Sequence, residues 1–175
     1  MSTALRGTPL REEDIRTGKA LTTEWHGKID YTFDAGAAIG QFLHGLKDGK
    51  LLGRKCHACG RTMIPPRMFC ERCFRRSDEW VELKDSGRVN TFSVSFVNWD
   101  ASRRQTPQVP AVIEIDGASQ GMGILHLLGE VGNSLAEVLE HVKVGMPVQA
   151  VWKPAEQREG SITDILYFRP AATKR

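Results

Sequence analysis

Alternating hydrophobic and polar residues run through most of the second half of the chain. In Val89–Val97, phenylalanine and valine alternate with serine and threonine, the pattern of a strand with one buried face. Gly87 stands just before this stretch and can bend it, as a long strand in a small barrel requires. The same reasoning predicts four further strands, at Pro110–Asp116, Met122–Leu128, Pro147–Lys153 and Ile162–Phe168.

Two other stretches have the helical period instead. Over residues 34–49, apolar residues fall at i, i+3, i+4 and i+7, with Asp34 as a plausible N-cap and Gly49 at the end, which predicts a helix. Its stripe, formed by Ile39, Phe42, Leu43 and Leu46, would cover either the core of this protein or a surface of another. The sequence leaves both open.

The second helix begins at Ser134, which has capping-box spacing to Glu137. Its apolar stripe consists of Leu135, Val138, Leu139 and Val142, and Gly145 ends the segment. A helix between the third and fourth of five strands is the element order of an OB-fold. We therefore expect a mainly β protein with a five-stranded OB-fold barrel over residues 79–170.

The first 33 residues show no sustained period. Arg11–Asp14 is a charged cluster, and four apolar residues alternate loosely: Trp25, Ile29, Tyr31 and Phe33. This segment is expected to be an extended arm lying on another surface or a partly ordered tail. The expected organisation is an arm and helix (1–49), a metal module (50–78), the barrel (79–170) and a short tail (171–175).

All four cysteines lie in the metal module, as two Cys-x-x-Cys pairs ten residues apart: Cys56, Cys59, Cys70 and Cys73. Each pair can present two thiolates to one tetrahedral ion, and this spacing predicts a rubredoxin-like zinc ribbon. Short strands are expected at Leu51-Leu52 and Met63-Ile64, with a rigid turn at Pro65-Pro66. Iron in the same four-sulfur geometry is the main alternative to zinc.

Committing every sulfur to a metal has a consequence for function. A closed four-thiolate site has no open position for water, so the zinc is expected to be structural. No cysteine remains as a nucleophile, and neither a serine elbow nor a carboxylate pair stands out. We expect that the chain is not catalytic on its own.

Composition indicates the class of protein and the cellular compartment. The chain is 41% hydrophobic and 26% charged, with a net charge of +3, as in ordinary globular proteins. Met1–Arg11 has no apolar segment of a signal peptide, and no run is long enough to span a bilayer. Reduced cysteines and the absence of a targeting segment favour the cytoplasm. A membrane partner is not expected.

Basic residues concentrate in the metal module. Between residues 50 and 76, eight basic residues face Glu71 alone, a formal +7. A zinc ion with four thiolates would contribute −2. The excess can attract the phosphates of a nucleic acid or of a nucleotide-bearing cofactor, or can serve only to balance the anionic metal centre.

Three histidines and one glycine motif are expected to have structural rather than catalytic or cofactor-binding roles. Gly121-Met122-Gly123 lacks the third glycine of a dinucleotide loop, because His126 stands in its place. His126 alternates with buried-type residues and is expected to be a barrel histidine with its hydrogen bonds satisfied. His57 lies between two ligands but is not needed in a tetrahedron that is already filled. His141 is expected on the helix surface.

Several segments together resemble one family. They are Phe42–Leu51, Cys56–Gly60, Ile64–Arg67, Cys70–Cys73, Val144–Val148 and Phe168–Pro170. They are similar to zinc-ribbon/OB-fold proteins that were once of unknown function and are now associated with acyl-CoA enzymes. The resemblance covers about residues 38–170, and Glu71 departs from it where the family often has proline.

The resemblance implies a partner. Family members form complexes with thiolases or related aldolases that act on acyl-CoA, which implies an accessory subunit in a two-plus-two hetero-oligomer beside a thiolase-like catalytic subunit. The basic ribbon would then bind the phosphates of coenzyme A or acyl-CoA, with Arg54, Lys55 and Arg67 as candidates. The same resemblance does not name the acyl group.

A single-stranded nucleic-acid binder is the alternative. Its barrel should carry exposed aromatic residues among basic ones, yet Phe92 and Phe96 alternate with serine and threonine. Only Asn98–Arg104, which holds Trp99, Arg103 and Arg104, has a suitable composition. That segment suits a protein interface equally well.

Overall fold

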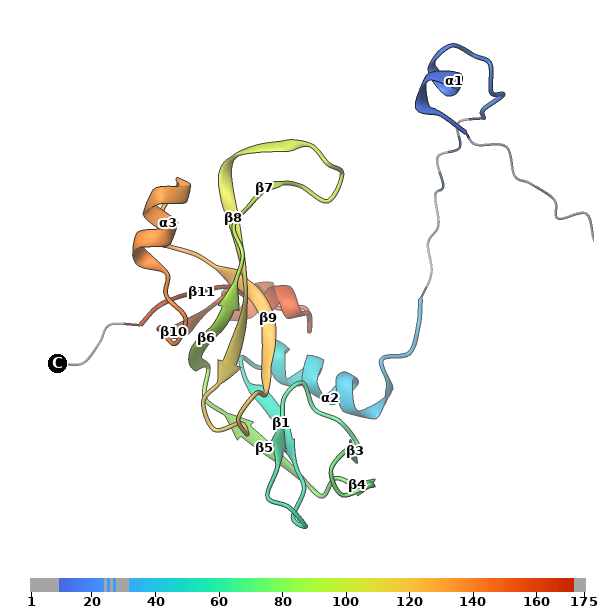
Figure 1. Cartoon of the computed structure of the whole chain (residues 1–175). Helices are drawn as coiled ribbons and strands as arrows, with labels where there is room; N and C mark the ends of the chain where they lie inside the picture. Colours follow the sequence, from blue (N-terminus) through green and yellow to red (C-terminus); the bar gives the residue numbers. More distant parts are fainter. Residues whose placement is uncertain (1–9, 24, 26, 28–31, 172–175) are drawn as a thin grey trace, which may run out of the picture. The chain divides into compact units, whose positions relative to one another are not determined.

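The computed structural model describes residues 10–23, 25, 27 and 32–171 (Figure 1). The chain divides into two units, Met1–Asp34 and Ala35–Arg175. The first unit holds a short helix, α1 (Glu12–Arg16), at whose start Asp14 accepts a hydrogen bond from the Arg11 N–H at 3.3 Å. Of the arm residues noted above, Trp25 and Phe33 are exposed, whereas Ile29 and Tyr31 lie outside the described residues.

The second unit contains a closed barrel of five strands. They are β6 (Ser86–Phe92), β8 (Arg103–Ile115), β9 (Gly123–Leu128), β10 (Pro147–Trp152) and β11 (Ile165–Pro170). The order β6-β10-β11-β9-β8 closes because β8 also pairs with β6. Neighbours are antiparallel except β9 and β11, which are parallel. With helix α3 (Leu135–His141) between β9 and β10, this is the OB-fold that the sequence predicts.

The barrel core follows from the period-two pattern. On β8, Val109 to Ile115 bury every second side chain, and these pack against Val148 and Phe168. Gly87 lies where β6 passes from β8 to β10, and a Cβ at this position would stand 2.2 Å from the Glu114 carbonyl oxygen. Only glycine fits this bend, as the sequence predicts.

The structure corrects three of the predicted strands. The expected strand Ile162–Phe168 begins only at Ile165, because Ile162–Asp164 forms a short 3-10 helix. The expected single strand Val89–Val97 is interrupted, so that β6 ends at Phe92 and β7 (Ser95–Val97) follows. The expected strand Pro110–Asp116 begins much earlier, at Arg103. The added part of β8 pairs with β7, and together they form a hairpin arm, residues 95–108, that projects from the barrel (Figure 1). Proline is tolerated in such an edge pair, so Pro107 does not end the strand.

The ribbon precedes the barrel and has two small sheets. In the first, β1 (Leu51–Lys55) lies between β2 (Thr62–Met63) and β5 (Glu79–Leu83). The second consists of β3 (Phe69–Cys70) and β4 (Arg75–Arg76). Although β5 lies within the range expected for the barrel (79–170), all five of its residues pair with β1.

Helix α2 (Gly36–Lys47) packs on the ribbon and barrel. Phe42 and Leu46 are buried in one continuous core with Leu51, Leu83 and residues of the barrel strands. Of the two readings of the α2 stripe, the structure thus favours the protein's own core. The N-cap is Ala35 rather than Asp34.

Two further details concern α3. Ser134 is its N-cap and accepts a hydrogen bond from the Glu137 N–H, as its spacing predicts. Of the predicted stripe, Val138 and Val142 are buried but Leu135 and Leu139 remain 48% exposed, because this helix of seven residues covers the barrel with one edge only.

Among the described helices, none has both the length and the apolar character that a membrane-spanning helix needs.

Candidate metal centre and the surfaces around it

The four cysteines lie on two tight turns. The residue after each pair adopts a left-handed backbone conformation, Gly60 with φ 73° and Phe74 with φ 49°. In the first turn, the Gly60 N–H donates to the Cys56 carbonyl and the Cys56 N–H donates to the Arg61 carbonyl, both at 2.8 Å. These bonds close the turn, so that Cys56 and Cys59 face the same side.

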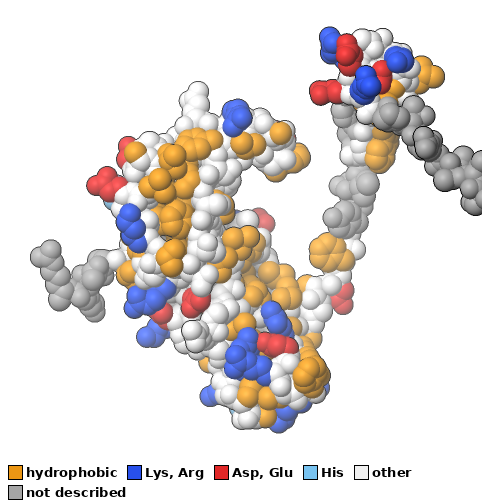
Figure 2. All heavy atoms as spheres, in the orientation of Figure 1, with side chains coloured by type: hydrophobic (Ala, Val, Ile, Leu, Met, Phe, Trp, Pro, Cys, Tyr) orange, Lys and Arg blue, Asp and Glu red, His pale blue; other side chains and the backbone are white. Residues whose placement is uncertain are grey.

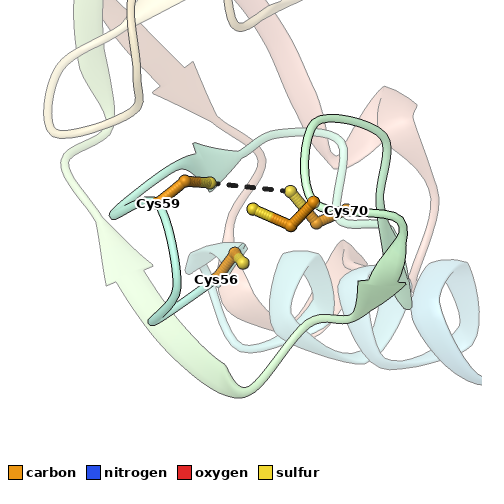
Figure 3. A group of neighbouring side chains, drawn as sticks. Cys56, Cys59 and Cys70 are labelled. Carbon is orange, nitrogen blue, oxygen red and sulfur yellow. Dashed lines mark hydrogen bonds between the residues drawn. The ribbon is translucent and has the colours of Figure 1, made fainter.

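The sulfur atoms of Cys56, Cys59, Cys70 and Cys73 all lie within 4.8 Å of one another. Figure 3 shows the labelled side chains pointing toward a common centre, with Cys59 and Cys70 sulfurs 3.7 Å apart. A tetrahedral site with Zn–S bonds of about 2.3 Å requires S···S edges of about 3.8 Å. The donor set and its spacing therefore fit a four-thiolate metal, whereas a disulfide needs about 2.05 Å.

The thiols perturb one another strongly. Burial raises the pKa of Cys70, but hydrogen bonds from the backbone N–H groups of Cys73 and Arg72 outweigh it and lower that pKa to about 7. The hydrogen bond with Cys59 and burial raise the pKa of Cys73 to about 12. Four adjacent sulfurs can therefore all be thiolates only when a cation neutralises them.

Two acidic residues at and just before the start of β5 hold the first turn. Asp78 accepts a hydrogen bond from the His57 N–H at 2.7 Å and pairs with Arg75 at 2.8 Å. The His57 N–H, and then the Arg75 charge, lower the pKa of Asp78. The His57 ring lies 2.9 Å from the Glu79 carboxylate, so its side chain has a partner away from the four sulfurs.

The ribbon is attached directly to the barrel. In the turn between β8 and β9, Ser119 donates its N–H to the Thr62 carbonyl at 3.0 Å and accepts the Thr62 N–H at 2.9 Å through its hydroxyl. Met122, from the same turn, packs against the buried group of Cys56, Met63 and Cys70. The Gly121-Met122-Gly123 segment thus supports the metal centre from the barrel side.

The three candidate phosphate ligands occupy different environments. Arg54 is only 5% exposed, donates to the Ser77 hydroxyl at 3.1 Å, and stacks 4.8 Å above the Trp80 ring. Lys55 is half-buried at the end of β1. Arg67 is exposed, with a long contact of 3.9 Å to Glu71. Arg54 therefore links β1 to Ser77 and β5 within the ribbon, while Lys55 and Arg67 are more exposed.

Part of the basic excess is balanced by acidic residues that follow the window counted above. Lys50 pairs with Glu82 at 3.0 Å, and within the window Arg61 pairs with Glu71 at 2.9 Å. Extending the count to residue 82 gives eight basic and four acidic residues, a formal +4. Figure 2 shows basic and acidic side chains together at this end of the molecule. The charge count over residues 50–76 does not include the acidic residues of β5, which the pairing of β5 with β1 brings next to the basic ones.

A shallow apolar groove of about 500 Å³ lies on the barrel, between β8, β9 and the start of β11. His126 lies in it, accepting the Leu127 N–H at Nδ1 (2.8 Å) and donating from Nε2 to the Ile162 carbonyl (3.1 Å). Its ring also meets the edge of Phe168 at 5.7 Å. His126 is thus a barrel histidine with both nitrogens bonded, as expected, and His141 is exposed.

Comparison with known proteins agrees with these two parts. The family model described as "ChsH2, rubredoxin-like zinc ribbon domain" matches residues 43–79, and "ChsH2, C-terminal OB-fold domain" matches residues 80–153. A DUF35 domain-containing scaffold protein of Methanocaldococcus jannaschii is 30% identical over 123 residues, 69% of this chain and 81% of the relative. Another, from Methanothermobacter thermautotrophicus, is 37% identical over 68 residues, covering 38% of this chain and 50% of the relative.

Two solved structures share the fold. A DUF35-family protein of unknown function from Sulfolobus solfataricus matches with a TM-score of 0.56 and 27% identity, over 77% of this chain and 84% of that one. A chain of the Ltp2-ChsH2(DUF35) aldolase matches with a TM-score of 0.54 and 22% identity, over 81% and 98%.

Proposed function

Because this chain belongs to the DUF35 family, with a ChsH2-type zinc ribbon followed by an OB-fold, we propose that it is a non-catalytic accessory subunit of a thiolase-fold enzyme. The partner, a thiolase or an aldolase, acts on acyl-CoA thioesters and holds the catalytic residues. Together they form a two-plus-two assembly, as a symmetric thiolase-fold dimer would require. The four free cysteines suit a reducing compartment, the cytoplasm.

The convergence of all four sulfurs on one site carries this proposal. Thiolase chemistry needs a reactive thiolate, and a closed tetrathiolate zinc site leaves none in this chain. Zinc instead fixes the ribbon, whose strands β2, β3 and β4 are two residues each and form little structure alone. A fold neighbour from the Ltp2-ChsH2(DUF35) aldolase supports the pairing with an enzyme.

Co-expression tests this function. The chain is produced with and without each thiolase-fold protein encoded near it in its source genome, and mass is measured by light scattering after size exclusion. We expect one partner to form a stable complex that turns over an acyl-CoA thioester. Elemental analysis should find one zinc per chain. Turnover by the chain alone, or no complex with any of these proteins, would refute the proposal.

We further propose that Lys55 and Arg67 bind the phosphates of coenzyme A in that complex. Arg67 is exposed and Lys55 is half-buried, whereas the guanidinium of Arg54 is already engaged with Ser77 and Trp80. Replacing both with glutamine should raise the Kd for CoA at least about tenfold, the loss of two charge-assisted contacts. Arg88→Gln, which changes an exposed residue of β6, is the control. Equal CoA affinity of the control and of the double variant would contradict the assignment.

A further inference from the structure

The hairpin arm ends in a turn that holds a tryptophan in solvent. Trp99 is 98% exposed. By contrast, Trp80 and Trp152 each lie under the guanidinium of an arginine. Tryptophan, with tyrosine and arginine, is enriched at the energetic centres of protein interfaces. A fully exposed tryptophan at the tip of a projecting hairpin therefore suggests a binding role.

Hydrogen bonds make the turn rigid around this side chain. The Asn98 N–H donates to the Ser102 carbonyl at 2.9 Å, and the Asn98 amide donates to the Ser102 hydroxyl at 2.8 Å. Asp100 accepts both the hydroxyl (2.6 Å) and the N–H (3.0 Å) of Ser102. Arg104 donates to the Asn98 side-chain oxygen at 2.8 Å. A turn fixed in this way presents Trp99 with little further loss of conformational entropy on binding.

The arm continues into the apolar groove of the barrel. Gln108 is the link, since it pairs with Ser95 of β7 and also lines the groove. Leu125, Ile162 and Leu166 line the same groove and are 67%, 37% and 44% exposed. Figure 2 shows hydrophobic and basic side chains on the surface of the projecting arm. An apolar groove lined by exposed leucine and isoleucine side chains is typical of an interaction site.

We propose that the Trp99 turn and the groove together form the docking surface for the catalytic partner protein. Trp99 enters an apolar pocket of the partner, and an apolar segment of the partner covers Leu125 and Leu166. Arg103, which is exposed and pairs with Val97 across the hairpin, meets a carboxylate at the rim of that pocket. This inference rests on the proposed function and adds to it the surface that the partner occupies.

Charge favours a protein over a single-stranded nucleic acid as the occupant. A nucleic-acid groove needs cations along its length to track the phosphates. Here the one lysine of the groove, Lys153, lies 3.8 Å from the buried Asp164 carboxylate. Arg104 is bonded back to its own hairpin at Asn98 and Thr106. With Lys153 and Arg104 engaged in this way, Arg103 is the third cation of this surface and would meet a phosphate singly.

Binding of the purified full chain to the partner identified by co-expression tests the proposal. Trp99→Ala should raise the Kd at least about thirtyfold, the loss typical of a central interface tryptophan, and Trp99→Phe should restore part of it. Leu125→Arg in the groove should weaken binding similarly. Leu139→Ala is the control, because Leu139 is 48% exposed on α3 and does not line the groove. Circular dichroism and zinc content should be unchanged in all four.

The outcomes are distinct. A complex that forms with an unchanged Kd for Trp99→Ala and Leu125→Arg would overturn the docking surface but leave the proposed function standing. No complex with the wild-type chain would overturn both. A mixed-sequence single-stranded oligonucleotide that binds wild type and loses affinity with Trp99→Ala would assign the surface to nucleic acid. A wild-type homodimer that Trp99→Ala converts to monomer would assign it to a second copy of this chain.

Discussion

Gly45 lies where α2 meets β1, and replacing it with alanine tests how closely the helix is packed. A Cβ at this position would lie 2.7 Å from Leu52 Cγ, 2.8 Å from Leu52 Cδ1 and 3.1 Å from the Lys50 carbonyl oxygen. Lys50 cannot withdraw easily, because its N–H donates to the Gly45 carbonyl at 2.8 Å. Gly40, in the same helix, has nothing within 4 Å of its added Cβ.

The two sites therefore separate two effects of opposite sign. Alanine in place of glycine within a helix gains about 0.8–1.0 kcal/mol from propensity alone, so Gly40→Ala should stabilise by about that amount. At Gly45 the same gain is offset by overpacking, which costs about 1–3 kcal/mol in a close-packed interior. We expect Gly45→Ala to be neutral or destabilising by up to about 2 kcal/mol, and about 1–3 kcal/mol less stable than Gly40→Ala.

Urea unfolding of the zinc-loaded chain measures both changes. The midpoints should move in opposite directions, or only that of Gly40→Ala should rise, with the slope m constant. Because propensity cancels between the variants, their difference reports the contact with Leu52 and Lys50. Equal stabilisation by both substitutions would show that α2 does not approach β1 as described.

Three other predictions concern buried charge and metal. Asp164 is fully buried, and although burial raises its pKa, the N–H groups of Glu159, Ser161 and Gly160 lower it on balance. The stability it contributes is therefore present above its unfolded pKa of about 3.9 and is lost as pH falls through the lower folded value. Asp164→Asn should cost about 2–4 kcal/mol at pH 7, and its deficit against wild type in urea unfolding should shrink below about pH 4; a deficit that does not change with pH would contradict this. Arg54→Lys should lower the free energy of unfolding by about 1–3 kcal/mol, because lysine cannot both hydrogen-bond Ser77 and lie flat on Trp80. The zinc content should be unchanged. A urea midpoint equal to that of wild type would show that the stacking contributes nothing. Removing zinc with a chelator should lower the Tm of the whole second unit by about 10 °C or more, and a barrel transition left in place in calorimetry would argue against the shared core.

Local sequence was sufficient where the pattern and its structural cause lie close together. The two Cys-x-x-Cys pairs, the bend at Gly87 and the Ser134 N-cap each depend on residues within a few positions. The OB-fold followed from the order of five alternating strands and a helix. In each case the spacing of the residues along the chain follows directly from the geometry of the metal site, bend, helix cap or strand that they form.

Partner choice at long range was not visible in the same way. Trp80–Leu83 alternates like a barrel strand, yet it pairs with β1. This pairing places Glu79 opposite Lys55 and Glu82 beside Lys50, residues far apart in the sequence. Leu139 has the spacing of a core residue, but α3 is too short and too near the edge to bury it. Arg54 carries charge like its neighbours and is nevertheless buried. Each outcome depends on which surfaces meet, which periodicity does not encode.

The core that runs unbroken from Phe42 through Leu51 and Leu83 into the barrel makes the ribbon a poor candidate for transplantation. A fragment cut at residue 79 would lose Leu83 and expose Leu46 and Leu51, and a barrel cut there would lose the Thr62–Ser119 link. Shuffling of these two halves between relatives should therefore succeed only when both sides of that seam are exchanged together.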